Sequence, residues 1–195
     1  MKTLDIEIQG ICPILFNRFT EEAQEGLDRG SGGKKLNKTQ RLAEAKKKVY
    51  RENNKKSGPI GVPFINTMKS IRIGSQTAGI KVGRRGAEPF IRATCFIEQA
   101  FVPIKKNGKA LIEADGIHEC TGRIPPGTRG AMAIIRRPYV DTGWTMEFTV
   151  LLMDERIAPI MFEEALNEAG SVVGLCDHRP EYGRFRVLKC EERKP

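Results

Sequence analysis

The sequence predicts one α+β domain spanning residues 1–195, with an antiparallel sheet, helices packed on it and a basic insertion. Three observations predict this class. Segments with alternating apolar and polar residues occur near both ends of the chain, an amphipathic helical segment precedes the last of them, and a lysine-rich polar segment interrupts the first half. A chain of 195 residues lies within the range of a single domain.

The first strand is expected over residues 3–16, because Leu4, Ile6 and Ile8 alternate with polar residues. This alternation is unlike a signal peptide, and the sequence has no apolar run of membrane-spanning length. We therefore expect a soluble protein with no membrane partner. The five cysteines are scattered and form no CxxC motif, which favours the reducing cytoplasm.

Residues 20–58 are interpreted as a basic, mobile insertion. They contain few large apolar residues, and residues 31–60 carry a net charge of +8. Asn37 or Thr39 could cap a short helix that runs to about Arg51. A solvated linker without function is the alternative for this segment.

A helix is predicted over residues 66–75, with Asn66 as its cap and Lys69 and Arg72 on its outward face. The glycine-arginine loop that follows contains Arg84 and Arg85. Its glycines would allow the backbone to lie close to a phosphate chain.

Two hairpins are predicted in the second half of the chain. Asn107-Gly108 is a strong turn signal between strand-like residues 94–106 and 109–120. The second hairpin would join residues 130–140 to residues 144–155 through the turn Asp141-Thr142-Gly143.

An amphipathic helix over residues 158–169 is expected to bury Phe162 and Leu166 and to end at Gly170. A glycine-containing loop and a last strand, "FRVLKCEE", follow it. Strand, helix, loop and strand make up the second half of a ferredoxin-like, RRM-related βαββαβ fold.

The loop "GLCDHRPEYGRF", residues 174–185, is compatible with three chemistries. Cys176 and His178 repeat the spacing of His118 and Cys120, and four such ligands would suit zinc. Either histidine could act as a general acid or base in RNA cleavage.

Polyanion binding is the third chemistry and uses more of the loop. Arg179, Arg184 and Arg186 offer paired donors to phosphate, and Tyr182 and Phe185 could stack on bases. Alternatively, Arg179 and Arg184 pair with the neighbouring carboxylates and Phe185 belongs to the core. The net charge of +9 favours a polyanionic partner in general.

Two segments give the chain a resemblance to a known superfamily. "GVPFINTMKSIR" and "GLCDHRPEYGRF" resemble motifs of the RAMP superfamily of RNA-binding proteins, which includes backbone subunits of CRISPR effector complexes. With the opening strand, the chain is also similar to small bacteriophage proteins. The resemblance implies a ferredoxin-like core, a groove with Lys69 and Arg72 on phosphates, and subunits that stack along a nucleic acid.

The leading hypothesis is a non-catalytic, cytoplasmic, phage-type protein that binds single-stranded DNA or RNA without a cofactor and forms homo-oligomers along it. The alternatives are an RNA-cleaving or RNA-processing enzyme on the same fold, and a virion or assembly protein. The predicted nucleic-acid-binding residues are Lys69, Arg72, Arg84, Arg85, Arg136, Arg137, Arg179, Tyr182, Arg184 and Arg186.

Overall fold

The centre of the molecule is an antiparallel sheet built around β1 (Lys2–Gly10). The computed structural model describes residues 1–21, 37–52, 57–124 and 131–193. β1 lies between β13 (Phe185–Glu192) and β12 (Thr145–Leu152), and β6 (Cys95–Ile97) pairs with the other edge of β12. The alternation predicted at the N-terminus is confirmed, because Leu4, Ile6 and Ile8 are buried. The predicted strand 3–16 is in fact interrupted, and its second part is the short β2 (Ile14–Leu15).

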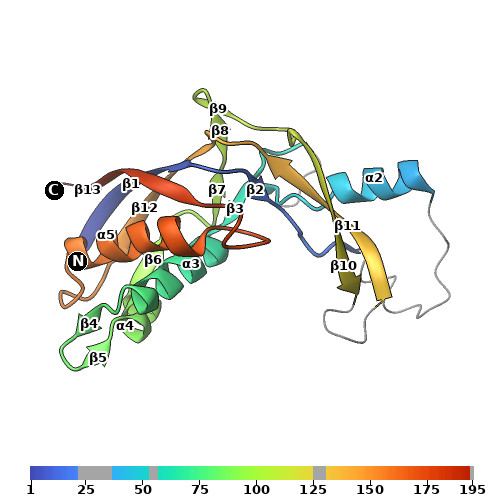
Figure 1. The fold of residues 1–195 in the computed structure, drawn as a ribbon. Helices are drawn as coiled ribbons and strands as arrows, with labels where there is room; N and C mark the ends of the chain where they lie inside the picture. Colours follow the sequence, from blue (N-terminus) through green and yellow to red (C-terminus); the bar gives the residue numbers. More distant parts are fainter. Residues whose placement is uncertain (22–36, 53–56, 125–130, 194–195) are drawn as a thin grey trace.

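Two helices cover one face of this sheet (Figure 1). α3 (Phe64–Thr77) and α5 (Pro159–Glu168) pack against each other closely, since a side-chain carbon at Gly74 would lie 2.4 Å from the carbonyl oxygen of Ala165. The opposite face of the sheet carries polar side chains, and no helix of the described part of the chain covers it.

Neither helix has the predicted bounds, and α3 extends beyond the predicted residues 66–75 at both ends. α3 begins at Phe64, directly after β3 (Gly61–Pro63), so Asn66 lies within the helix and does not cap it. Pro63 directly precedes the helix, and the fixed φ of proline fits the entry to a helix.

α5 does not end at Gly170. The chain continues as a π-helix, η3 (Ala169–Val173), and turns at Gly174, where φ is 79°. Gly170 instead allows close packing, because a side-chain carbon there would lie 2.3 Å from the carbonyl oxygen of Phe185.

Short elements complete the body of the molecule. β7 (Phe101–Pro103) pairs with β3, and β8 (Lys105–Lys106) pairs with β12. The Asn107-Gly108 turn is confirmed: it joins β8 to β9 (Lys109–Ala110), and both turn residues have positive φ. β4 (Lys81–Val82), β5 (Arg85–Gly86) and α4 (Glu88–Thr94) lie at one end of the body.

A separate unit, here called the arm, extends from the body (Figure 1). It consists of the long hairpin β10 (Gly116–Ile124) and β11 (Ala131–Val140) together with α2 (Lys38–Lys46), which contacts β11. β2 pairs with β11 at the base of the arm.

In the arm the structure differs from two predictions made from the sequence. The predicted hairpin between residues 130–140 and 144–155 does not form, because β11 pairs with β10 while β12 crosses into the central sheet and pairs with β1. The predicted insertion 20–58 lies partly outside the described residues, at 22–36 and 53–56. Its helix has the expected Asn37 cap, ends at Lys46 rather than near Arg51, and packs on the arm.

Candidate nucleic-acid interface

The loop between η3 and β13, residues 174–183, is closed at its neck by two glycines. Gly174 and Gly183 have φ values of 79° and 75°, and the amide of Leu175 donates a hydrogen bond to the carbonyl oxygen of Gly183 at 2.9 Å. A side-chain carbon at Gly183 would lie 2.1 Å from the carbonyl oxygen of Leu175. The glycines therefore serve to bring the two sides of the loop together.

The loop is also fixed from outside. The buried Ser70 hydroxyl on α3 donates a hydrogen bond to the Gly174 carbonyl oxygen at 2.7 Å, and the Asp177 amide donates one to the Leu15 carbonyl oxygen at 3.1 Å. The Arg137 guanidinium on β11 forms an ion pair with the Asp177 carboxylate. The loop thus lies at the junction of the body and the arm.

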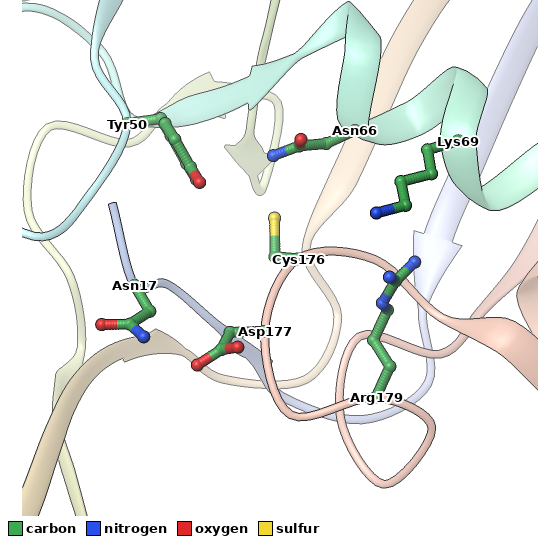
Figure 2. Close-up of a pocket in the computed structure, with 7 residues that line it drawn as sticks. All are labelled: Asn17, Tyr50, Asn66, Lys69, Cys176, Asp177 and Arg179. Carbon is green, nitrogen blue, oxygen red and sulfur yellow. The ribbon is translucent and has the colours of Figure 1, made fainter. Parts of the chain in front are cut away.

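A small cavity of about 120 Å³ opens at this junction (Figure 2). The Lys69 amine and the Arg179 guanidinium point toward the same space from α3 and from the loop. Within the described residues, neither cation has a hydrogen-bond or ion-pair partner. The full lining consists of Asn17, Tyr50, Asn66, Lys69, Cys176, Asp177 and Arg179.

The cavity contains hydrogen-bond donors that an anion could use, but no strong nucleophile. Burial raises the pKa of the Tyr50 hydroxyl, so it stays protonated near neutral pH and can donate. Burial also raises the pKa of the Cys176 thiol to about 12, with the Arg179 charge opposing this shift. A neutral thiol is a poor nucleophile and a poor metal ligand. The Asp177 carboxylate is balanced by Arg137.

Three aromatic rings meet beside the cavity. The ring centroid of Tyr182 is 5.2 Å from that of His118 and 5.5 Å from that of His178, and the two imidazoles are 6.4 Å apart. His118 comes from β10 and the other two from the loop, so the rings connect the arm to the body. We call His118, His178 and Tyr182 the ring triad.

The ring triad bears on the zinc hypothesis. The structure brings the two histidines together, as that hypothesis requires. Nevertheless, no group of three or more histidine, cysteine, aspartate or glutamate side chains among the described residues is arranged to hold a metal ion.

Five predicted arginines have partners within the protein: Arg186, described below, and the four described here. Arg72 forms an ion pair with Glu88, Arg136 with Glu119, and Arg137 with Asp177. Arg184 donates a hydrogen bond to the carbonyl oxygen of Pro180 at 2.7 Å.

The structure does not gather all the predicted residues. Lys69 and Arg179 line the same cavity, Tyr182 of the same loop as Arg179 belongs to the ring triad, and Arg137 pairs with Asp177 of the cavity lining. Arg84 and Arg85 lie at the β4–β5 end of the body. Arg186 extends from β13 over the open sheet face, where it donates to the Gln9 side chain at 2.5 Å.

Three residues of the cavity were not predicted. Asn66 lies one helical turn before Lys69, so the helical spacing could have indicated it. Asn17 and Tyr50 come from distant segments, and no local pattern in the sequence connects them to the loop. Phe185 is only 2% exposed, so it belongs to the core and is not available for stacking on a base.

The open face of the sheet is a poor platform for bases. Its strands carry ion pairs and hydrogen bonds such as Arg193 with Asp5 and Lys105 with Glu147. Single-strand platforms present aromatic rings in a positively charged surface. The junction has such rings in the ring triad, together with two cations, Lys69 and Arg179, that have no partner among the described residues.

Comparison with known proteins adds to the description of the fold. No family model and no curated protein sequence matches the chain. The chain is similar to a solved chain described as "Cryo-EM structure of the Type III-B Cmr-beta bound to cognate target RNA", with a TM-score of 0.55 and 16% sequence identity. The match covers 99% of this chain and 61% of that chain. At this identity the similarity concerns the fold alone, which is consistent with the RAMP-like architecture expected from the sequence.

No helix in the described part of the chain is both long and apolar enough to cross a membrane.

Proposed function

We propose that the protein binds single-stranded nucleic acid at the junction of body and arm, without catalysing a reaction. The observation that carries this proposal is a pair of cations, Lys69 and Arg179, directed into one small cavity with no partner in the part of the chain that the structure describes. About 120 Å³ suits a small group such as a phosphate and is below the roughly 300–1,000 Å³ of a typical small-molecule site.

The fold supports this proposal. The sheet order β13, β1, β12, β6 places the last, first, third and second strands of a βαββαβ unit side by side, with α3 and α5 as its two helices. We therefore assign the core to the ferredoxin-like, RAMP-related class. RNA is the first ligand to test, because the structurally similar chain comes from a complex bound to RNA.

The arm extends the proposed surface beyond the cavity. On α2 the side chains of Lys38, Arg41 and Lys46 are exposed, which gives a phosphate chain further positive charge to follow. As part of the same proposal, several copies assemble along one strand, in the cytoplasm of a bacterial host and encoded by a phage.

The test compares two charge-reversed variants by fluorescence anisotropy, using labelled unstructured RNA and DNA of about 15 nucleotides. Lys69→Glu with Arg179→Glu removes the cavity cations. Lys81→Glu with Arg92→Glu changes the net charge equally, at exposed positions on β4 and α4.

The cavity variant should bind roughly tenfold or more weakly, and its plot of log affinity against log salt should be shallower by about two units. The control should stay close to wild type. The proposal is wrong if wild type does not bind at low salt, or if both variants lose affinity equally.

An RNA-cleaving enzyme is the second candidate, and the 6.4 Å separation of the two imidazoles favours it. One imidazole would take the proton of a 2′-hydroxyl as that oxygen attacks phosphorus, and the other would protonate the departing 5′-oxygen. Labelled RNA incubated with wild type, His118→Ala and His178→Ala separates the two functions. Cleavage lost in either variant supports the enzyme, and intact RNA throughout supports binding alone.

A further inference from the structure

We propose that the ring triad, His118, His178 and Tyr182, is a subsite for one unpaired nucleobase, next to the phosphate cavity. This inference rests on the proposed function, because it assumes a strand whose phosphate occupies the space between Lys69 and Arg179. The inference adds that the ligand must carry a nucleobase at this site, whereas phosphate binding alone needs no base.

The arrangement of the rings leaves stacking surface available. His178 is perpendicular to Tyr182, at 88°, and close to perpendicular to His118, at 76°. In an edge-to-face contact one ring presents only its edge, so both of its own faces stay clear of the partner ring. His178 is exposed, and the other two rings are partly exposed, so a base can reach the cluster.

The polar atoms of the triad are also available. Across the residues that the structure describes, neither imidazole nor the Tyr182 hydroxyl takes part in a hydrogen bond or an ion pair. A buried structural histidine or tyrosine usually satisfies its polar atoms within the protein. These atoms can contact the edge of a base, although the proposed affinity comes from stacking on the ring faces.

The position of the triad fits a nucleotide. His178 lies between Asp177 and Arg179 in the chain, and both of these line the cavity. Neighbouring Cα atoms are about 3.8 Å apart, so the ring and the guanidinium start from adjacent points of one loop. A phosphate at Arg179 would therefore place its attached sugar and base close to the rings.

The test measures binding of two ligands of equal length and charge, an RNA oligomer and its fully abasic counterpart. Tyr182→Leu and His118→Leu remove a ring, while Tyr182→Phe and His118→Phe keep one. Phe96→Leu is the control, because Phe96 is an exposed ring on β6, away from the junction. Thermal melting of every variant monitors folding.

Stacking predicts that the leucine variants bind RNA roughly 5- to 150-fold more weakly, while the phenylalanine variants and Phe96→Leu stay within a few-fold of wild type. The abasic oligomer should bind wild type weakly and be indifferent to the leucine substitutions.

The subsite is wrong if wild type binds both ligands equally, a result that leaves phosphate binding at Lys69 and Arg179 intact. It is also wrong if the phenylalanine variants lose as much affinity as the leucine variants, because the rings would then not act by stacking. Absence of binding to either ligand at low salt would refute the proposed function itself, and the subsite with it.

Discussion

Gly183 shows how a single residue holds the candidate interface in shape. Its φ of 75° and its contact with the carbonyl oxygen of Leu175 leave no room for a side chain. The sequence indicated that glycines matter in this loop, but it did not show that they meet each other rather than a ligand. The contact joins Gly183 to Leu175, eight positions earlier, so no local sequence pattern could predict it.

Replacing Gly183 with alanine should lower the free energy of unfolding by more than the ~1–2 kcal/mol that a left-handed conformation alone costs. Gly79→Ala is the matched control, because Gly79 also has a positive φ, of 68°, but has open space around it. Urea denaturation of both variants gives the comparison. Equal losses would show that the close contact at Gly183 contributes nothing.

Lys69 and Arg72 show where residue-level prediction ends. Helical spacing predicted both residues on the outward face of α3. In the structure Lys69 is exposed and Arg72 is partly exposed. Glu88, which forms an ion pair with Arg72, comes from the next helix, and only the tertiary fold brings it into contact. The sequence therefore located the helix and its cations, but it could not tell that Arg72 forms an ion pair while Lys69 has no partner among the described residues.

At the scale of elements, the arm is the main departure from prediction. Asp141-Thr142-Gly143 between two apolar segments is typical of a hairpin turn, yet β11 and β12 belong to different sheets. Turn signals describe the local bend. Strand partners depend on which other segment offers a matching buried face, and β1 offers one to β12 over eight residue pairs. The amphipathic α5 and the strand β13, which depend on local periodicity, were predicted well.

The ion pair between Arg137 and Asp177 should couple the arm to the loop. A double-mutant cycle with Arg137→Gln and Asp177→Asn is expected to give a coupling energy of about 0.5–3 kcal/mol in urea denaturation, since the Arg137 side chain is only 12% exposed. A coupling energy near zero would mean that the pair does not hold the two parts together.

At the scale of the whole molecule, three thiols that are buried or half-buried should make the fold sensitive to alkali. Burial raises the pKa of Cys176 to about 12 and those of Cys95 and Cys190 to about 11, from an ordinary value of 9.0. At a pH between about 9 and these raised values, the thiols of the unfolded chain have lost protons that those of the folded chain keep. The free energy of unfolding therefore falls as pH rises above about 9.

Cys176→Ala should therefore show a smaller loss of stability than wild type when urea denaturation at about pH 8 is compared with about pH 10. The variant removes one group whose ionisation favours unfolding and leaves the other two. If wild type and variant lose equal stability over this interval, the Cys176 thiol is not shielded from ionisation by the fold.

The overall charge of +9 indicated a polyanionic partner, but charge alone could not choose a surface. We propose the junction, because several charges of the open sheet face form ion pairs within the protein, whereas Lys69 and Arg179 have no partner among the described residues and lie near the ring triad. This choice of surface is the central claim of the account.

Photo-crosslinking with RNA that contains 4-thiouridine tests that claim most directly, because it records which residues contact the strand. After irradiation and digestion, mass spectrometry should find adducts on the loop 174–183 and on α3, with β10 as a further site. Adducts confined to β1, β12 and β13, on the open face of the sheet, would contradict the account.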